Sequence, residues 1–333
     1  MKILGKILLF IVIIIGIIIV ISFFLPRKIH VERTKQIDAP SHIVFNQVND
    51  LHNWDKWSPW QQIDSAMEKI YFGEGKGKGA GFEWKSEHPN VGNGKIEISS
   101  SVFPDSVITQ INFGDQGIAN AYHVFNETDS GTSVTWGFNS DLGGNPFAKY
   151  MGLIINKKIG ADYEKGLNSL QNLCVHLPEY EIIEKEMETF SYIGIKTRCN
   201  NDEIALKMGE TYNELMGYVI ENNIEPFNAP ICIYYYYDTL QTEFEAAIPV
   251  AKIPKLKGNI KAGKIPSGKY IKTIHYGPYD QLINAYEALQ AYMNKNGLKM
   301  AGMPWEKYKT DPQKEPDSKK WITNIYFPVK SIE

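Results

Sequence analysis

The apolar and charged positions divide the chain into three segments with different patterns. The first, residues 7–25, contains no charged side chain and consists almost entirely of Ile, Val, Leu and Phe. At ~1.5 Å per residue a helix of this length covers about 28 Å, close to the ~30 Å hydrocarbon core of a bilayer. Pro26, Arg27 and Lys28 follow, instead of the small-residue site that a cleaved signal peptide would need. The pattern therefore favours an uncleaved transmembrane anchor, residues 1–28, over a cleaved signal.

The side of the membrane stays open. Lys2 and Lys6 precede the apolar run and Arg27 and Lys28 follow it, so the positive-inside rule gives no clear orientation. Three widely spaced cysteines support no disulfide framework and favour the cytoplasm. The predicted localisation is a single-pass membrane protein, with a preference for soluble domains on the cytoplasmic side.

Residues 29–177 read as an antiparallel sheet followed by one long helix. Residues 29–37 alternate as a strand, and a short helical stretch follows at 43–48. Six further strand-like runs are separated by Gly, Asn, Asp and Pro: 69–72, 81–86, 94–101, 106–113, 118–126 and 132–139. Residues 146–174 then carry apolar side chains at helical spacing. We expect an antiparallel sheet wrapped on this helix.

The start of this segment resembles a known family. Ile37-Asp38-Ala39-Pro40, followed by Val44-Phe45-Asn46-Gln47-Val48-Asn49-Asp50-Leu51 and Trp54-Asp55-Lys56-Trp57-Ser58-Pro59-Trp60, is similar to the opening of START-like (SRPBCC, polyketide-cyclase-like) helix-grip domains. The resemblance implies an apolar cavity for a lipid-like or aromatic ligand. Packing of Trp54, Trp57 and Trp60 onto the sheet is favoured over ligand contact.

The third segment, residues 180–333, contains an internal repeat. A shift of 74 aligns residues 211–237 with 285–311 without a gap. The identical pairs include Tyr212 with Tyr286, Leu215 with Leu289, Tyr218 with Tyr292, Pro230 with Pro304 and Tyr234 with Tyr308. Each half reads strand, helix, strand, strand, so the predicted domain has a pseudo-twofold and a groove where the halves meet. The whole chain is thus an α+β protein with an N-terminal membrane helix.

Several motifs of this segment look like those of the GyrI-like, effector-binding family: Tyr276-Gly277-Pro278-Tyr279, Pro304-Trp305-Glu306-Lys307-Tyr308 and the terminal Trp321-Ile322-Thr323-Asn324-Ile325-Tyr326-Phe327-Pro328-Val329. The resemblance implies capture of small molecules, often aromatic or lipophilic cations, with Glu306 as the acidic pocket residue. It also implies an alternative, since some members resemble hydrolases of small electrophiles that use a glutamate and a tyrosine.

The strand pattern agrees with a site at Glu306. Alternation places Glu306 and Tyr308 on one face and Trp305 on the other. A carboxylate beside aromatic rings suits a cation, whereas burial would make it a general acid or base. A Glu paired with a neighbouring Lys or backbone amide is the simpler alternative. The expected ligand contacts are Glu306, Tyr308, Tyr234, Tyr236 and Trp305, and Glu306 with Tyr308 would carry any catalysis.

The composition of the chain argues against several other classes of function. The net charge is −3 without a basic block, which argues against nucleic acid as a partner. Cysteines and histidines lack metal-ligand spacing, so we expect neither metal nor cofactor. The sequence favours a membrane-tethered protein that senses or sequesters a hydrophobic, possibly cationic small molecule, over the hydrolase and over an interaction scaffold without ligand. Enzyme activity and the oligomeric state stay open.

Overall fold

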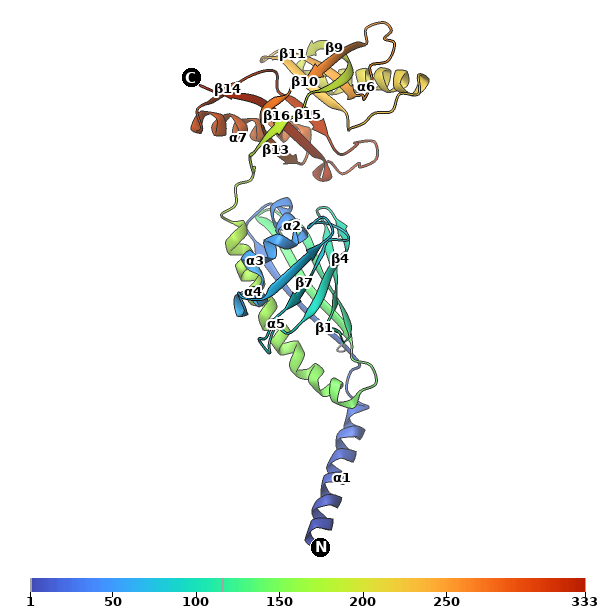
Figure 1. Ribbon diagram of the computed structural model, residues 1–333, viewed down its shortest axis with the longest axis vertical. Helices are drawn as coiled ribbons and strands as arrows, with labels where there is room; N and C mark the ends of the chain where they lie inside the picture. Colours follow the sequence, from blue (N-terminus) through green and yellow to red (C-terminus); the bar gives the residue numbers. More distant parts are fainter. Residues whose placement is uncertain (1, 115–116, 333) are drawn as a thin grey trace. The chain divides into compact units, whose positions relative to one another are not determined.

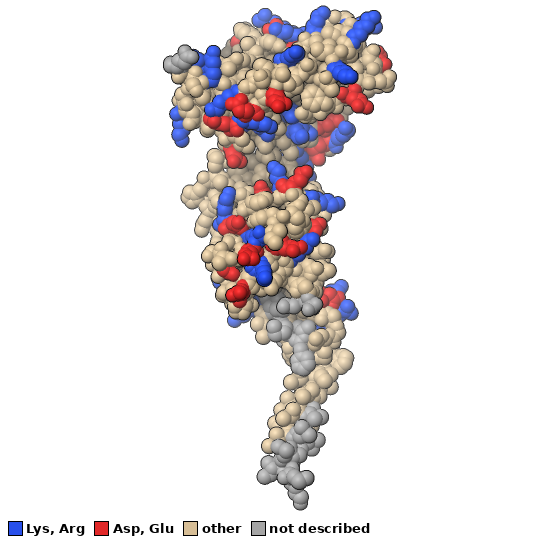
Figure 2. Space-filling view, in the orientation of Figure 1, with Lys and Arg blue, Asp and Glu red and all other residues tan. Residues whose placement is uncertain are grey.

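The computed structural model describes residues 2–114 and 117–332, so residues 1, 115–116 and 333 of the predicted segments lie outside this description. The chain forms two compact units that divide between Glu179 and Tyr180 (Figure 1). We call them unit 1 and unit 2. Acidic and basic side chains are interspersed over the visible face of each unit (Figure 2).

The membrane anchor predicted for residues 7–25 is wrong. No helix in the described ranges is long and apolar enough to cross a membrane. Helix α1 spans Lys2–Ser22 and stops three residues before the predicted end, so the uncharged part from residue 7 covers only about 24 Å. The end of α1 is held by α5, because Lys149 Nζ donates to the Ser22 carbonyl oxygen at 3.0 Å and Tyr150 Oη donates to that of Ile18 at 2.8 Å. The membrane localisation predicted from this anchor is therefore wrong as well.

Unit 1 is a single antiparallel sheet against one long helix. The seven strands follow the order β1-β7-β6-β5-β4-β3-β2. Their bounds are β1 Lys28–Ile37, β2 Glu68–Phe72, β3 Gly81–Lys85, β4 Gly94–Val102, β5 Ser106–Asn112, β6 Ile118–Thr128 and β7 Gly131–Asp141. Helix α5, Pro146–Cys174, buries Tyr163, Leu167 and Leu170 against the sheet. The alternation of apolar residues in the strands supplies the other half of this core.

Short helices connect β1 to β2. They are α2 (Ser41–Asn49), a 3₁₀ turn (Leu51–Asn53), α3 (Trp54–Trp57) and α4 (Pro59–Ile63). Trp54 and Trp57 are buried and donate their indole N–H groups to the carbonyl oxygens of Val48 and Gln47, which fixes the corner between α2 and α3. This corner closes one side of the space under the sheet.

Unit 2 is a larger antiparallel sheet with the order β12-β9-β11-β10-β15-β16-β13-β8, and β14 pairs with β16. The strand bounds are β8 Ile183–Met187, β9 Phe190–Asn200, β10 Ile231–Tyr237, β11 Gln241–Pro249, β12 Lys261–Ile265, β13 Gly268–Tyr276, β14 Leu298–Met300, β15 Trp305–Tyr308 and β16 Ile322–Ser331. Strands β8, β12 and β14 are additions to the pattern read from the sequence. The two halves of the repeat meet where β10 pairs with β15.

The pseudo-twofold is visible in the backbone at this seam. Tyr234 N donates to the Pro304 carbonyl oxygen, and the equivalent Tyr308 N donates to that of Pro230, at 3.1 and 3.2 Å. Helices α6 (Ile204–Glu221) and α7 (Leu282–Lys295) pack on β9/β11 and on β13/β16 through separate apolar clusters. Because each helix covers its own half, the sheet between them is covered by side chains of the seam.

Candidate functional site

Glu306 lies at the centre of this seam, on the face that carries the helices. Glu306 is buried, with an exposed fraction of only 2%. Three phenol groups donate to its carboxylate: Tyr308 at 2.7 Å and Tyr234 at 3.2 Å to Oε2, and Tyr286 at 2.8 Å to Oε1. The carboxylate therefore has a hydrogen-bond donor on each oxygen.

The three tyrosines come from three elements. Tyr308 follows Glu306 by two residues in β15, so strand alternation puts both side chains on one face. Tyr234 comes from β10 across the seam, and its hydroxyl lies 3.3 Å from that of Tyr308. Tyr286 comes from α7 and packs its ring on Phe327 at 5.5 Å between centroids. Only the folded domain brings these groups together.

Further aromatic rings surround the carboxylate. The ring of Tyr279 lies 5.5 Å from that of Tyr308 and 4.6 Å from that of Trp321. Tyr212, from α6, approaches Tyr308 edge-on at 6.3 Å. These rings are half-buried, whereas Glu306 beneath them is buried. We call Glu306 with Tyr212, Tyr234, Tyr279, Tyr286, Tyr308 and Trp321 the acidic aromatic cluster.

Glu306 has no ion-pair partner in the part of the chain that the structure describes. Within residues 2–114 and 117–332 no Lys, Arg or His forms an ion pair with it, so the pairing with a neighbouring lysine that the sequence left open is absent. Burial raises the pKa of Glu306 above its ordinary value, and the hydrogen bonds from Tyr308, Tyr286 and Tyr234 oppose that rise. The site thus offers an ionisable carboxylate that is stabilised by dipoles alone.

Two of the expected ligand contacts lie elsewhere. A β-bulge between Tyr234 and Tyr236 shifts the register of β10, so that Tyr236 pairs with Glu243, is 43% exposed and lies under Arg198. Trp305 points to the opposite face of the sheet, where it is 1% exposed and stacks on Tyr326 at 3.9 Å. The structure brings together Glu306, Tyr308 and Tyr234, but neither Tyr236 nor Trp305.

Sequence reasoning did not assign Tyr212, Tyr279, Tyr286 and Trp321 to the site. The repeat did single out Tyr212 and Tyr286 as an identical pair, but it gave them no place at the site. Their environments differ: Tyr286 donates to Glu306, and Tyr212 donates to the Ile231 carbonyl oxygen at 2.7 Å. The repeat carried a signal, because Tyr212 and Tyr286 are equivalent positions of it and both belong to the cluster around Glu306.

The repeat is broken at the position equivalent to Glu306. Cys232 of β10 pairs directly with Glu306 of β15 and is fully buried. Burial, followed by the charge of Glu306, raises the pKa of this thiol well above its usual value. The cluster therefore has one ionisable carboxylate and, opposite it, a neutral thiol.

Unit 1 holds a cavity of about 360 Å³ beneath its sheet. Aromatic side chains dominate its wall, among them Trp54, Trp60, Phe82, Trp84 and Trp136. The volume is within the ~300–1,000 Å³ typical of small-molecule sites. Of the three tryptophans in the opening motif, Trp57 is in the core without lining the cavity, whereas Trp54 and Trp60 line it.

No metal centre accompanies either site. The described residues contain no group of three or more His, Cys, Asp or Glu side chains arranged to hold a metal ion. The cysteines Cys174, Cys199 and Cys232 are all buried free thiols.

Comparison with known structures gives several similar chains. The EcmrR C-terminal domain is 24% identical, and the match covers 46% of this chain and 100% of that domain with a TM-score of 0.40. The structure of SAV2435 bound to tetraphenylphosphonium is 17% identical over 45% of this chain and 94% of that one, with a TM-score of 0.35. A hydrolase from Listeria innocua is 11% identical over 48% and 97%, with a TM-score of 0.33. A comparison with curated proteins found no match.

Family models match both units. Residues 28–175 match the polyketide cyclase/dehydrase and lipid transport family. Residues 179–330 match the GyrI-like small molecule binding domain. The two matches confirm the two-domain architecture, and the second supports small-molecule binding by this chain.

Proposed function

We propose that unit 2 binds a small lipophilic cation at the acidic aromatic cluster. One observation carries the proposal: Glu306 is a buried carboxylate without a cationic partner among the described residues, set beneath half-buried aromatic rings. An unpaired buried charge is costly, so such a group is expected where a ligand supplies the opposite charge. Hydrogen bonds from three tyrosines keep the carboxylate in place until the ligand arrives.

Both parts of the site favour positive charge. A cation whose centre lies about 6 Å from the carboxylate gains roughly 3 kcal/mol at an effective dielectric constant of about 20. Contact with the faces of Tyr279, Trp321 or Tyr308 adds ~0.5–2 kcal/mol. A neutral molecule of the same shape gains neither term. The site should therefore discriminate between a cation and its uncharged isostere by at least about 100-fold.

The test is calorimetric titration of the full chain with tetraphenylphosphonium, repeated with Glu306→Gln. We expect saturable binding that weakens about 100-fold in the variant, because the amide keeps the shape of the side chain and removes its charge. A matched control is Glu245→Gln. Glu245 is also buried and also accepts from two tyrosines, Tyr192 at 3.0 Å and Tyr235 at 2.6 Å, but on the opposite face of the sheet.

The control distinguishes the loss of any buried carboxylate in unit 2 from the loss of the Glu306 carboxylate. Glu245→Gln should leave the affinity within about twofold. Absence of saturable binding by the unaltered chain, or equal weakening in both variants, would refute the proposal. Turnover of an electrophilic ester or epoxide that disappears with Glu306→Gln would instead favour the hydrolase alternative.

For unit 1, the cavity favours a second, uncharged ligand of aromatic or lipid-like character. The test is fluorescence titration of the full chain with N-phenyl-1-naphthylamine, compared with Ala121→Met. Ala121 is buried and lines the cavity, so the longer side chain should fill part of it and weaken binding at least tenfold. Ala119→Met, two residues away on the same strand and outside the cavity wall, is the control. Equal affinity in all three proteins would exclude the cavity as the binding place.

A further inference from the structure

A second pocket of unit 1, with a different chemical character, lies between the edge strand β1 and the first half of α5. Its volume is about 530 Å³. Strand β1 contributes Lys28, His30 and Arg33, and α5 contributes Lys149, Asn156 and Lys157. No Asp or Glu lines it. Pro26, Ile29 and Gly152 complete the wall. Its polar side chains are thus mainly hydrogen-bond donors and positive charges, in contrast to the aromatic cavity beneath the sheet.

The pocket follows from how closely α5 approaches β1. Gly152 faces β1, and a Cβ there would lie 2.7 Å from Leu142 Cδ1 and 3.3 Å from Ile29 Cδ1. Lys149, Gly152 and Asn156 share one face of α5 through their i, i+3 and i+7 spacing. Asn156 Nδ2 donates to the His30 carbonyl oxygen at 3.4 Å, which joins the two walls. The polar side chains of α5 therefore lie beside those of β1 along the wall of one pocket.

Most of the positive charge in this pocket is not neutralised by the protein. Arg33 is paired with Glu164 at 2.6 Å. Asp141, opposite Lys28 in the sheet register, is held by Arg27 at 2.7 Å. Lys149 donates to a backbone carbonyl. In the part of the chain that the structure describes, no carboxylate forms an ion pair with Lys28, Lys149 or Lys157. Three ammonium groups thus border one pocket, and none of them forms an ion pair with another described residue.

We propose that this pocket binds a multiply charged oxyanion, a small phosphate or diphosphate compound. Its oxygens accept hydrogen bonds in several directions, which suits a wall made of donors. Two or more negative charges could pair with more than one of the three lysines, which a monoanion such as chloride cannot. The site belongs to unit 1, whereas the acidic aromatic cluster belongs to unit 2, and the proposal does not depend on the function proposed for that cluster.

The experiment uses inorganic pyrophosphate as the probe and the full chain. Binding is measured by calorimetry at 50 and 200 mM NaCl for the unaltered protein and for the double variant Lys28→Gln/Lys157→Gln. Each lysine near an anion contributes about fivefold in affinity, so the double variant should bind at least tenfold more weakly. Binding should also weaken at the higher salt concentration.

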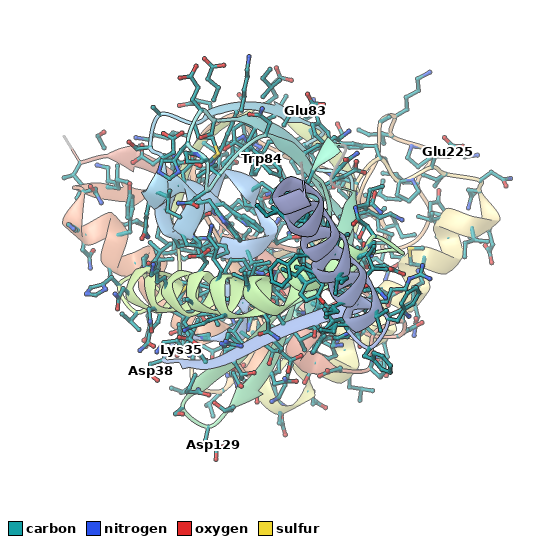
Figure 3. All side chains as sticks on the ribbon, turned by 90° about the horizontal axis from the view of Figure 1, so that it is seen from below. Lys35, Asp38, Glu83, Trp84, Asp129 and Glu225 are labelled. Atoms are coloured by element: carbon teal, nitrogen blue, oxygen red, sulfur yellow. The ribbon has the colours of Figure 1, made fainter. Side chains whose placement is uncertain are left out.

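The control is the double variant Lys35→Gln/Lys165→Gln. It makes the same change in net charge and alters the same two elements, β1 and α5, at positions outside the pocket wall. Figure 3 shows Lys35 toward the end of β1 that lies away from α1. This control should bind within twofold of the unaltered chain. The melting temperatures of both double variants are also measured. We expect them to be unchanged, because all four substituted lysines are half-buried or exposed.

Two results would overturn the proposal. One is the absence of saturable pyrophosphate binding at 50 mM NaCl. The other is equal weakening in the two double variants, which would mean that pyrophosphate responds to net charge and not to the pocket. A loss confined to Lys28→Gln/Lys157→Gln supports the site.

Discussion

Acidification should destabilise unit 1 through one buried side chain, His123. The imidazole is 0% exposed, and the rings of Trp54, Trp57 and Trp136 surround it, the last at 4.8 Å between centroids. Neither ring nitrogen has a hydrogen-bond partner among the residues that the structure describes. Burial lowers the pKa of His123 to about 3, because the charged form would lose its hydration without gaining an acceptor.

The direction of the effect on stability depends on how many protons His123 binds in the folded and in the unfolded state. In the unfolded chain the pKa of a histidine is about 6.5, so below that pH the unfolded state binds a proton that the folded state excludes. The free energy of unfolding therefore falls as the pH drops from 6.5 toward 3. At roughly 1.4 kcal/mol per pH unit, the loss between pH 7 and pH 4.5 is about 3 kcal/mol. Above pH 7, His123 should no longer contribute to the pH dependence of the free energy of unfolding.

The assay is urea unfolding at pH 7 and pH 4.5, followed by tryptophan fluorescence, for the unaltered chain and for His123→Phe. Five of the seven tryptophans, at positions 54, 57, 60, 84 and 136, belong to unit 1. The unaltered chain should lose about 3 kcal/mol more than the variant between the two pH values, since every other titrating group is common to both. Identical pH dependence would refute the reasoning, whatever the variant does to stability at pH 7.

Three further predictions concern unit 2. Tetraphenylphosphonium affinity, titrated between pH 4 and 8, should rise with pH until Glu306 is fully ionised, and it should be independent of pH in Glu306→Gln, because protons compete with the cation for a carboxylate whose pKa is raised. Tyr308→Phe should weaken binding by about 3- to 10-fold by removing a hydrogen bond to the carboxylate, whereas Tyr236→Phe should change it less than twofold in the same titration. Cys232 should react with iodoacetamide at pH 8 at least 100-fold more slowly than free cysteine, by mass spectrometry, because its raised pKa keeps it a thiol; rapid alkylation would contradict the buried geometry.

Local pattern was enough for much of the secondary structure. Alternation fixed the strands of unit 1, and apolar residues at helical spacing fixed the helix over 146–174, which is α5. In unit 2 the shift of 74 related Tyr234 to Tyr308, and both lie at the seam. These signals succeed because they depend on the repeat distance of a strand, a helix or a duplicated unit, which a sequence displays directly.

The anchor shows where composition is insufficient. Residues 7–25 are apolar throughout, yet the helix ends at Ser22 and its last carbonyl groups accept hydrogen bonds from α5. Hydropathy predicts how favourable a helix would be in lipid, but the end of this helix is set by partners that lie more than a hundred residues away in the chain. No window of residues contains that information.

At the candidate site, too, local pattern predicted one part of the arrangement and packing between distant segments decided the other. The sequence by itself determined that Glu306 and Tyr308 share a face, because successive side chains of a strand alternate. Only the tertiary structure decided that Tyr286 completes the cluster and that Tyr236 does not, since the first depends on how α7 packs on β13 and β16 and the second on a bulge in β10. Strand period is a local property of the backbone, whereas helix placement and bulges result from packing between distant segments, and that packing sets which rings surround the carboxylate.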